Sequence, residues 1–151
     1  MNLFVGITCV IVGTIIGKLL SEKFKKRKIF YNDFYSFNQR MINEVSFKQT
    51  PLQKIISLED STFYYYLEEL IFNKNDEIYV SFLNSDENTF LKEYAQNIGV
   101  SDTYSQLVYL KSIDTQILNK MNCCIEDDKK YRKLYVKLGF LFGLIALVVI
   151  L

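Results

Sequence analysis

The sequence predicts an all-α protein, an antiparallel helical bundle domain with a transmembrane helix at each end. Only Pro51 and Gly99 break the long middle of the chain, whereas a β-domain needs turn residues about every 8 to 12 positions. Apolar residues recur there three and four positions apart, as on one face of a helix. The stretch from Val100 to Leu138 contains no Gly or Pro, which indicates one long C-terminal helix running into the membrane.

The two ends are predicted to be transmembrane helices at residues 1–20 and 134–151, around an all-helical domain at residues 21–133. Leu3 to Leu20 is apolar except for two threonines and one lysine, and Leu138 to Leu151 is entirely apolar or glycine. A helix of about 18 residues rises about 27 Å, close to the hydrocarbon thickness of about 30 Å. A buried core helix fits such runs poorly, because they have no polar face. Basic residues follow the first run instead of preceding it, which favours an uncleaved anchor over a signal peptide.

Charge is divided along the chain behind a net value of +1. Eleven of the 18 basic residues flank the inner ends of the apolar runs, and 16 of the 17 acidic residues lie between Ile29 and Asp128. Positive flanks stay on the cytoplasmic side of a membrane, which predicts a cytoplasmic domain with both termini on the far side. The basic flanks would hold this domain near anionic headgroups. The acidic middle argues against a nucleic-acid partner.

The first helix is expected to continue past the apolar run and to end near Phe47. Its inward face is a stripe at steps of three and four: Phe30, Phe34, Phe37, Met41 and Val45. Thr50, Pro51 and Gln53 then form the pattern of an N-cap, a first helical position and a capping box. They predict a short second helix, ending near Glu59–Asp60, with three inward residues: Leu52, Ile55 and Ile56.

Ser61 is expected to cap a third helix, whose inward face comprises Phe63, Leu67, Leu70 and Ile71. Residues 77–83 alternate like a strand, but a lone strand has no partner, so a short helix is expected there. Residues 84–88 are expected to form a polar loop. The next helix presents Phe90, Leu91, Tyr94, Ala95 and Ile98 and ends at Gly99 as a left-handed residue.

The final helix is expected to be capped by Ser101, with Asp102 in its first turn where the helix dipole favours an anion. Its apolar face comprises Leu107, Leu110, Ile117, Met121 and Cys124. Each apolar run also holds a glycine pair four residues apart: Gly13 with Gly17, and Gly139 with Gly143. Such pairs let membrane helices approach closely, although glycine is also simply common in membrane helices.

No set of residues in the sequence predicts catalysis, a cofactor site or a metal site. The chain has no histidine and only three cysteines, and it lacks a phosphate-binding glycine loop and a nucleophile elbow. Adjacent acids, such as Glu68 and Glu69, point apart on a helix. We therefore expect a non-enzymatic binding platform.

Three short segments of the chain form motifs with a defined order and spacing. The first is an E-x-x-aromatic-x-x-T-P-L corner formed by Glu44, Phe47, Thr50, Pro51 and Leu52. The second is an L-G-x-S-D-x-x-x-Q-like corner formed by Gly99, Ser101, Asp102 and Gln106. The third is an L-G-x-L-x-G-like membrane entry with Gly139 and Gly143. These three motifs resemble those of the stage III sporulation protein AB family, and their order, their spacing and the two-anchor layout are also similar to the family.

The resemblance implies a part in endospore formation. The family acts with the AA to AH proteins in the mother-cell membrane around the forespore, and with the forespore protein Q it forms a transenvelope complex that supports forespore development. Its helical domain is similar to the cytoplasmic domains of F-type platform proteins of type II secretion. By that analogy the partners are the AA-type secretion ATPase, the other membrane proteins of the complex and the bilayer, with no small-molecule substrate.

Three exposed acids are the expected contacts of the ATPase: Glu59, Glu68 and Asp76. A stand-alone small membrane protein of the immunity or stress type is the alternative, and it would have no ATPase partner. The neighbouring genes would separate the two hypotheses, because only the first requires companion sporulation genes.

Overall fold

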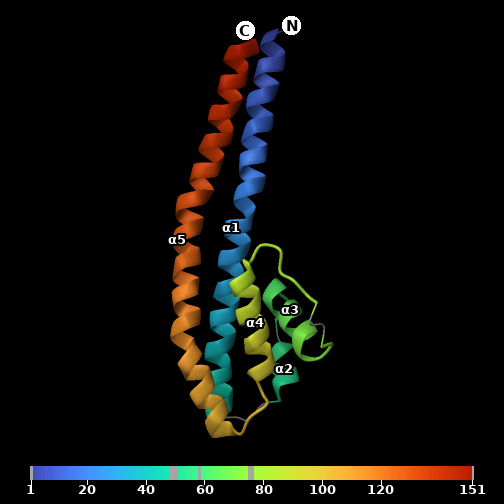
Figure 1. The fold of residues 1–151 in the computed structure, drawn as a ribbon, viewed down its shortest axis with the longest axis vertical. Coiled ribbons are helices and arrows are strands. Elements are labelled where there is room, and N and C mark those ends of the chain that lie inside the picture. The colour runs from blue at the N-terminus through green and yellow to red at the C-terminus, as the bar shows by residue number, and fades with distance from the viewer. Residues whose placement is uncertain (1, 48–50, 58, 75–76, 151) are drawn as a thin grey trace. The chain divides into compact units, whose positions relative to one another are not determined.

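The computed structural model describes residues 2–47, 51–57, 59–74 and 77–150 of the chain. Over these residues it contains helices and no strand, so the predicted all-α class is confirmed. The helices are α1 (Asn2–Phe47), α2 (Leu52–Ile56), α3 (Thr62–Ile71), α4 (Ser85–Asn97) and α5 (Thr103–Ile150) (Figure 1). The end of α1 at Phe47 and the length of α5 agree with the sequence prediction.

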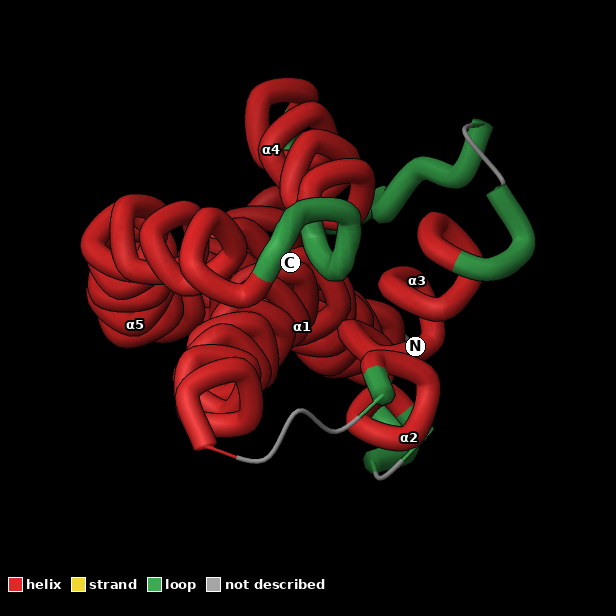
Figure 2. Tube along the Cα trace, turned by 90° about the horizontal axis from the view of Figure 1, so that it is seen from below, coloured by secondary structure: helices red, strands yellow, loops and turns green. Residues whose placement is uncertain are grey.

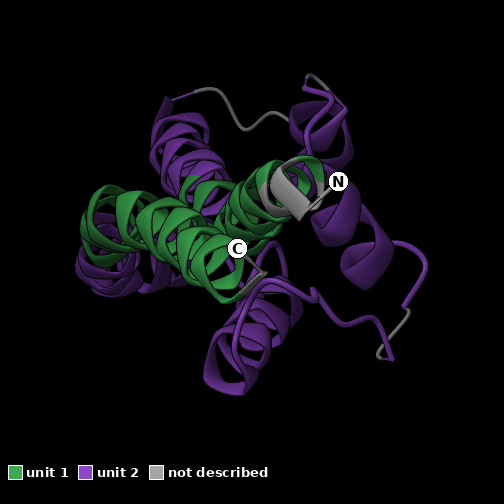
Figure 3. Cartoon of the chain, turned by 90° about the horizontal axis from the view of Figure 1, so that it is seen from above, with its two compact units in different colours: residues 1–28, 123–151 green, residues 29–122 purple. Residues whose placement is uncertain are grey.

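The chain divides into two compact units, coloured separately in Figure 3. Unit 1 comprises residues 1–28 and 123–151, and unit 2 comprises residues 29–122. Helices α1 and α5 each contribute one segment to both units.

Unit 1 is an antiparallel pair of helical segments. Helix α1 begins and helix α5 ends at the same end of this pair, at the top of Figure 1. Within the residues described, no helix has both the length and the apolar content needed to cross a bilayer.

Unit 2 is a helical bundle with an aromatic core centred on α1. The rings of Phe30 and Phe34 lie 5.3 and 5.0 Å from the ring of Phe63 on α3, and Phe34 lies 4.7 Å from Tyr94 on α4. Helices α2 and α4 both contact α3, and Figure 2 shows α1 in the middle of the labelled helices. Edge-on and offset ring pairs of this kind add to the free energy gained by burying apolar surface. The predicted stripe is therefore core, with only Val45 left partly exposed.

The inward faces of the later helices also agree with the prediction. Leu110 and Ile117 on α5 are fully buried, Cys124 is 1% exposed, and Leu107 and Met121 are partly buried. On α2, α3 and α4 the expected inward side chains are mostly buried as well: Ile55, Ile56, Phe63, Leu67, Leu70, Leu91, Tyr94, Ala95 and Ile98.

The expectation of a helix at residues 77–83, followed by a polar loop at 84–88, is wrong. Residues 77–83 are turns and irregular backbone, and α4 already begins at Ser85. Asn84 caps α4: its side chain accepts a hydrogen bond from the Glu87 amide at 2.8 Å, and the Glu87 carboxylate accepts one from the Asn84 amide at 3.0 Å. This reciprocal capping box satisfies two amide groups at the start of the helix.

The short second helix differs from its predicted bounds. It begins at Leu52, directly after Pro51, and it ends at Ile56 instead of near Glu59. Thr50, its expected cap, lies outside the described residues. Ser61 does precede α3 as expected, but its side chain makes no capping hydrogen bond there.

Candidate functional site

The turn between α4 and α5 is built by the residues of the second family-like corner. Gly99 has a φ of +74°, a left-handed conformation that glycine adopts without steric cost. The Gln106 carboxamide oxygen accepts hydrogen bonds from the Gly99 amide at 2.9 Å and from the Ser101 hydroxyl at 3.3 Å. A single side chain in the first turns of α5 thus holds the backbone that leads into it.

Asp102, and not Ser101, caps α5, which corrects the sequence prediction. One Asp102 carboxylate oxygen accepts hydrogen bonds from the Tyr104 and Ser105 amides, both at 3.1 Å. A hydrogen bond with the Ser105 side chain and then these amide bonds lower the pKa of Asp102. Ser101 and Asp102 are both favoured cap residues, and the choice follows from the Ser101 hydroxyl being turned to Gln106.

The two family-like corners meet at Leu52 and Gly99. A Cβ atom on Gly99 would lie 3.1 Å from Cδ2 of Leu52, nearer than ordinary van der Waals contact. Of the other residues of the first corner, Phe47 is 84% exposed, Glu44 is partly buried and Thr50 lies outside the described residues. The corner residues that the structure brings together therefore serve packing and backbone geometry.

The glycines of unit 1 bring its two helical segments into backbone contact. A Cβ atom on Gly13 would lie 2.6 Å from the Gly139 carbonyl oxygen, and one on Gly17 would lie 2.5 Å from the Tyr135 carbonyl oxygen. A Cβ on Gly143 would lie 2.6 Å from Cα of Val10. Both glycine pairs therefore act as the close-approach pattern predicts.

The remaining surface of unit 1 toward the chain ends is strongly apolar. Large apolar side chains are exposed there on both segments: Phe4, Ile7, Ile11, Val12, Ile15, Ile16, Leu19 and Leu20 on α1, and Phe140, Leu141, Phe142, Ile145, Val148 and Val149 on α5. Exposed apolar side chains in this number are typical of a surface that another apolar phase or a protein covers.

The inner part of unit 1 is charged and aromatic. Arg27 pairs with Asp127 at 2.8 Å and Lys28 with Asp128 at 2.5 Å. The Phe24 ring stacks on Tyr131, with 5.3 Å between the centroids. These contacts fix the register of the two segments, so that residues 23–28 lie level with residues 127–135.

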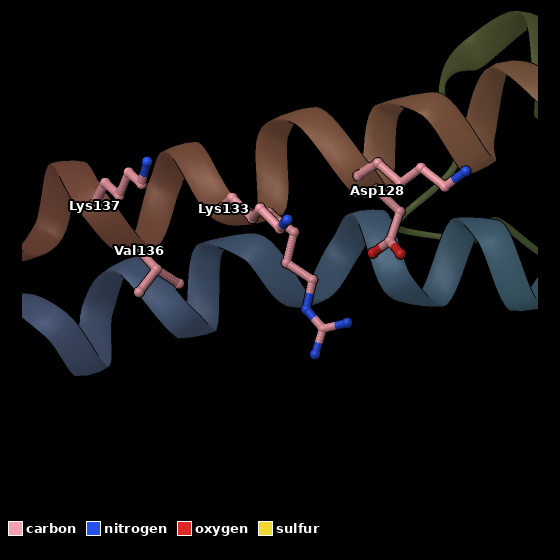
Figure 4. A pocket seen from close by; sticks show the side chains of 6 residues that line it. Asp128, Lys133, Val136 and Lys137 are labelled. Atoms are coloured by element: carbon pink, nitrogen blue, oxygen red, sulfur yellow. The ribbon is translucent and has the colours of Figure 1, made fainter.

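An open hollow lies beside these ion pairs on α5. It is lined by Asp128, Lys129, Arg132, Lys133, Val136 and Lys137 (Figure 4). Figure 4 shows the Asp128 carboxylate directed toward the neighbouring segment of α1, away from the Lys137 end of the hollow.

The acids expected to bind a partner lie on unit 2. Glu59 pairs with Arg40, and its hydrogen bond is the main cause of the raised pKa of that guanidinium. Glu68 is exposed on α3, whereas Asp76 lies outside the described residues. Unit 2 contains 13 acidic and 7 basic residues, so its net charge is −6.

A buried polar network in unit 2 was missed by sequence reasoning. The Asn38 amide nitrogen donates to the Asp114 carboxylate at 2.8 Å and to the Leu110 carbonyl at 3.3 Å, while the Tyr94 hydroxyl donates to the Asn38 carbonyl at 3.3 Å. Burial raises the pKa of Tyr94 well above its ordinary value. The signal in the sequence is Asn38 itself, a polar residue beside the aromatic stripe. This network joins α1, α4 and α5 and contains no nucleophile with an adjacent base.

The described residues contain no group of three or more histidine, cysteine or acidic side chains that could hold a metal ion. The family model for stage III sporulation protein AB matches residues 57–151. No curated protein and no solved structure matches the chain.

Proposed function

The chain belongs to the stage III sporulation protein AB family, and from that premise we propose that it is a membrane-attached platform subunit of a stage III sporulation complex. Family membership gives it a role in this stage of sporulation. In the proposal, unit 1 is the anchor in the mother-cell membrane around the forespore, and unit 2 is the cytoplasmic domain that docks a secretion-type ATPase. The division of charge and apolar surface between the two units is the observation that carries the proposal.

The anchor role is supported by the side chains that unit 1 leaves exposed. Leu19, Phe140 and Val149, for example, are 66%, 47% and 80% exposed, which is unfavourable in water and favourable among acyl chains. The backbone contact at the glycines is the kind of close packing that holds two helices together in lipid. The aromatic and basic residues at the inner part of unit 1 are the types found where helices leave a bilayer.

The docking role is supported by the charge of unit 2. A net charge of −6 on its 94 residues attracts a basic partner surface and speeds its approach. Glu59 and Glu68 are exposed acids of the α2–α3 region and are the side chains assigned to this contact.

Co-purification from sporulating cells tests the docking role. The tagged chain is expected to bring down a secretion-type ATPase, and the Glu59→Gln, Glu68→Lys variant is expected to recover several-fold less of it and to lower spore yield. Gln at position 59 is chosen because Arg40 would face a like charge if Glu59 became Lys. A Glu126→Lys change on unit 1, at an exposed position, is the control for a charge reversal outside unit 2.

Two results would contradict the docking role. One is the absence of any secretion-type ATPase among the proteins recovered with the unmodified chain. The other is an equal recovery and an equal spore yield for the unmodified chain and the Glu59, Glu68 variant.

A further inference from the structure

The hollow on unit 1 has an excess of positive charge that the protein does not neutralise. Four of its six lining residues are cations, and no ion pair involves Lys129, Arg132, Lys133 or Lys137 within the part of the chain that the structure describes. The one acid of the hollow, Asp128, already forms an ion pair with Lys28 on α1. Its Oδ2 lies 2.5 Å from the Lys28 Nζ, and its side chain is only 7% exposed. Cations gathered without a counter-charge repel one another and attract an anion.

The hollow is also large enough for a ligand and has a mixed wall. Its volume is about 540 Å³, within the range usual for ligand sites. Val136 and the aliphatic stems of the lysines form much of the wall. Arg132 brings a planar fork of donors that fits two oxygens of one phosphate, and the lysines add point charges.

The hollow lies where a charged surface changes into an apolar one along α5. Just beyond Lys137, α5 exposes large apolar side chains. They are Leu138, Phe140, Leu141 and Phe142, with exposed fractions of 40%, 47%, 52% and 66%. On the facing segment of α1, exposed Lys23, Lys25 and Lys26 are level with the hollow, because of the register set by the ion pairs. The ligand should therefore combine an anionic group with a long apolar part.

We propose that this hollow binds the headgroup phosphate of an anionic phospholipid. Arg132 and Lys133 hold the phosphate oxygens, Lys129 and Lys137 supply further positive charge, and the acyl chains follow the exposed apolar side chains of α5. The inference rests on the proposed anchor role of unit 1 and adds to it a preference for one class of lipid. Free phosphate would match the cations equally but would leave the apolar surface uncovered.

Vesicle binding by the full chain tests the inference. The chain is mixed from detergent into vesicles of phosphatidylcholine alone or of an equimolar mixture with phosphatidylglycerol, and the thermal midpoint of helix loss is measured. We expect a higher midpoint in the mixed vesicles. In detergent micelles, the Arg132→Gln, Lys133→Gln variant should bind added phosphatidylglycerol about 10- to 30-fold more weakly, because each cation near a lipid surface contributes about fivefold.

The matched control is Lys54→Gln with Lys111→Gln, which removes the same charge from exposed positions of unit 2. It should bind phosphatidylglycerol as the unmodified chain does. Equal weakening by both double variants would overturn the site, because net charge alone would then explain the binding. The lipid site would also be overturned if inorganic phosphate, at matched ionic strength, raised the thermal midpoint as much as phosphatidylglycerol does. The hollow would then bind a free anion.

Flotation of the chain with the same two kinds of vesicle separates the failure of the two proposals. If the chain floats with phosphatidylcholine vesicles but shows no preference for phosphatidylglycerol, the lipid site is wrong and the anchor role stands. If the chain floats with neither kind of vesicle, both are wrong.

Discussion

Asn88 organises the irregular backbone of residues 77–84, directly before α4. Its side-chain carbonyl accepts a hydrogen bond from the Val80 amide at 2.8 Å, and its amide nitrogen donates to the carbonyls of Val80 and Asn84 at 3.2 and 2.9 Å. Asn88 is 5% exposed, and Val80 is fully buried. Buried backbone groups normally form their hydrogen bonds within a helix or a sheet. Here the Asn88 side chain supplies hydrogen bonds to the Val80 backbone instead.

Replacing Asn88 by Ala should therefore destabilise unit 2 strongly. The buried Val80 amide would lose its partner, at about 1–3 kcal/mol for an unsatisfied group, and the Val80 carbonyl would keep only its bond from the Leu83 amide. We expect a loss of about 2–4 kcal/mol in denaturant unfolding of the full chain in detergent. Asn119→Ala is the control, because Asn119 lies on α5 with its side chain exposed, so a change within about 0.5 kcal/mol is expected. Equal effects of the two substitutions would refute this account of the segment.

The cap at Asp102 predicts a dependence of stability on pH. Hydrogen bonds from Ser105 lower the pKa of Asp102 in the folded chain, whereas an unfolded Asp has a pKa of about 3.9. Its stabilising contribution is therefore fully present above that value and is lost as the pH falls through the lowered folded pKa. The thermal midpoint of the unmodified chain should exceed that of Asp102→Asn most at neutral pH, and the gap should close in acid.

The difference between those two proteins isolates Asp102. Burial raises the pKa of Asp33. Because Asp33 is present in both proteins, its effect on the thermal midpoint cancels in the difference between them. Asn is itself a good cap, so the substitution removes the charge and keeps the hydrogen-bond acceptor. A gap that is constant from neutral to acid pH would show that the carboxylate charge does not stabilise α5.

Cap residues show what sequence can and cannot fix at this scale. Ser101 and Asp102 are adjacent and both suitable, and only the position of Gln106 in three dimensions decides between them. Asn84 carries the same ambiguity, because a polar run such as Asn84 to Asn88 is equally typical of a loop and of a capped first turn. The role of Asn88 depends on backbone groups eight residues away and has no sequence signature.

At the scale of elements, the sequence determines the helices well because apolar spacing and breakers agree. The aromatic stripe of α1, the stop at Gly99 and the unbroken α5 were all predicted. Residues 77–83 were not, because their alternating apolar residues match both a strand and a short buried segment. Val80 and Leu83 are buried there without any repeating backbone pattern.

The α4–α5 turn should be sensitive to the residue at position 99. A β-branched residue at a φ of +74° is sterically strained, and its Cβ would also press on Leu52. We expect Gly99→Val to cost more than about 2 kcal/mol in unfolding. Gly99→Asn should cost clearly less, because Asn tolerates this conformation although it makes the same contact with Leu52. Equal losses would assign the effect to the contact and not to the backbone.

The helix pair of unit 1 should reverse the usual effect of replacing glycine in a helix. Alanine is normally favoured over glycine there by about 1 kcal/mol. At Gly17, however, a Cβ would lie 2.5 Å from the Tyr135 carbonyl oxygen, so Gly17→Ala should lower stability in detergent by about 1–3 kcal/mol. Val12→Ile also adds one carbon, on an exposed face, and should change little. A stabilising Gly17→Ala would mean that the two segments are not in backbone contact.

At the scale of the whole molecule, the two units differ in charge and in surface. Unit 1 is positively charged and exposes large apolar side chains toward the chain ends, and unit 2 is negatively charged. Unit 1 contains 11 basic and 4 acidic residues, a net charge of +7, whereas unit 2 carries −6. This separation is visible in the sequence, because the basic residues flank the apolar runs. The pairing of the two ends in one unit was left open by the sequence, since glycine pairs at positions 13 and 139 suit contact with each other or with another subunit equally.

The sidedness of the chain follows from this separation and is the last prediction. Because the basic residues flank the inner ends of both apolar runs, the positive-inside preference predicts that unit 2 lies in the cytoplasm and that both termini lie outside. In a chain without its native cysteines, expressed in the cytoplasmic membrane of a non-sporulating bacterium, a cysteine at exposed Asn97 should resist an impermeant maleimide until the cells are opened. A cysteine at Asn2 should react in intact cells. The reverse pattern would place unit 2 outside, where a cytoplasmic ATPase has no access to it, and the platform role would be excluded.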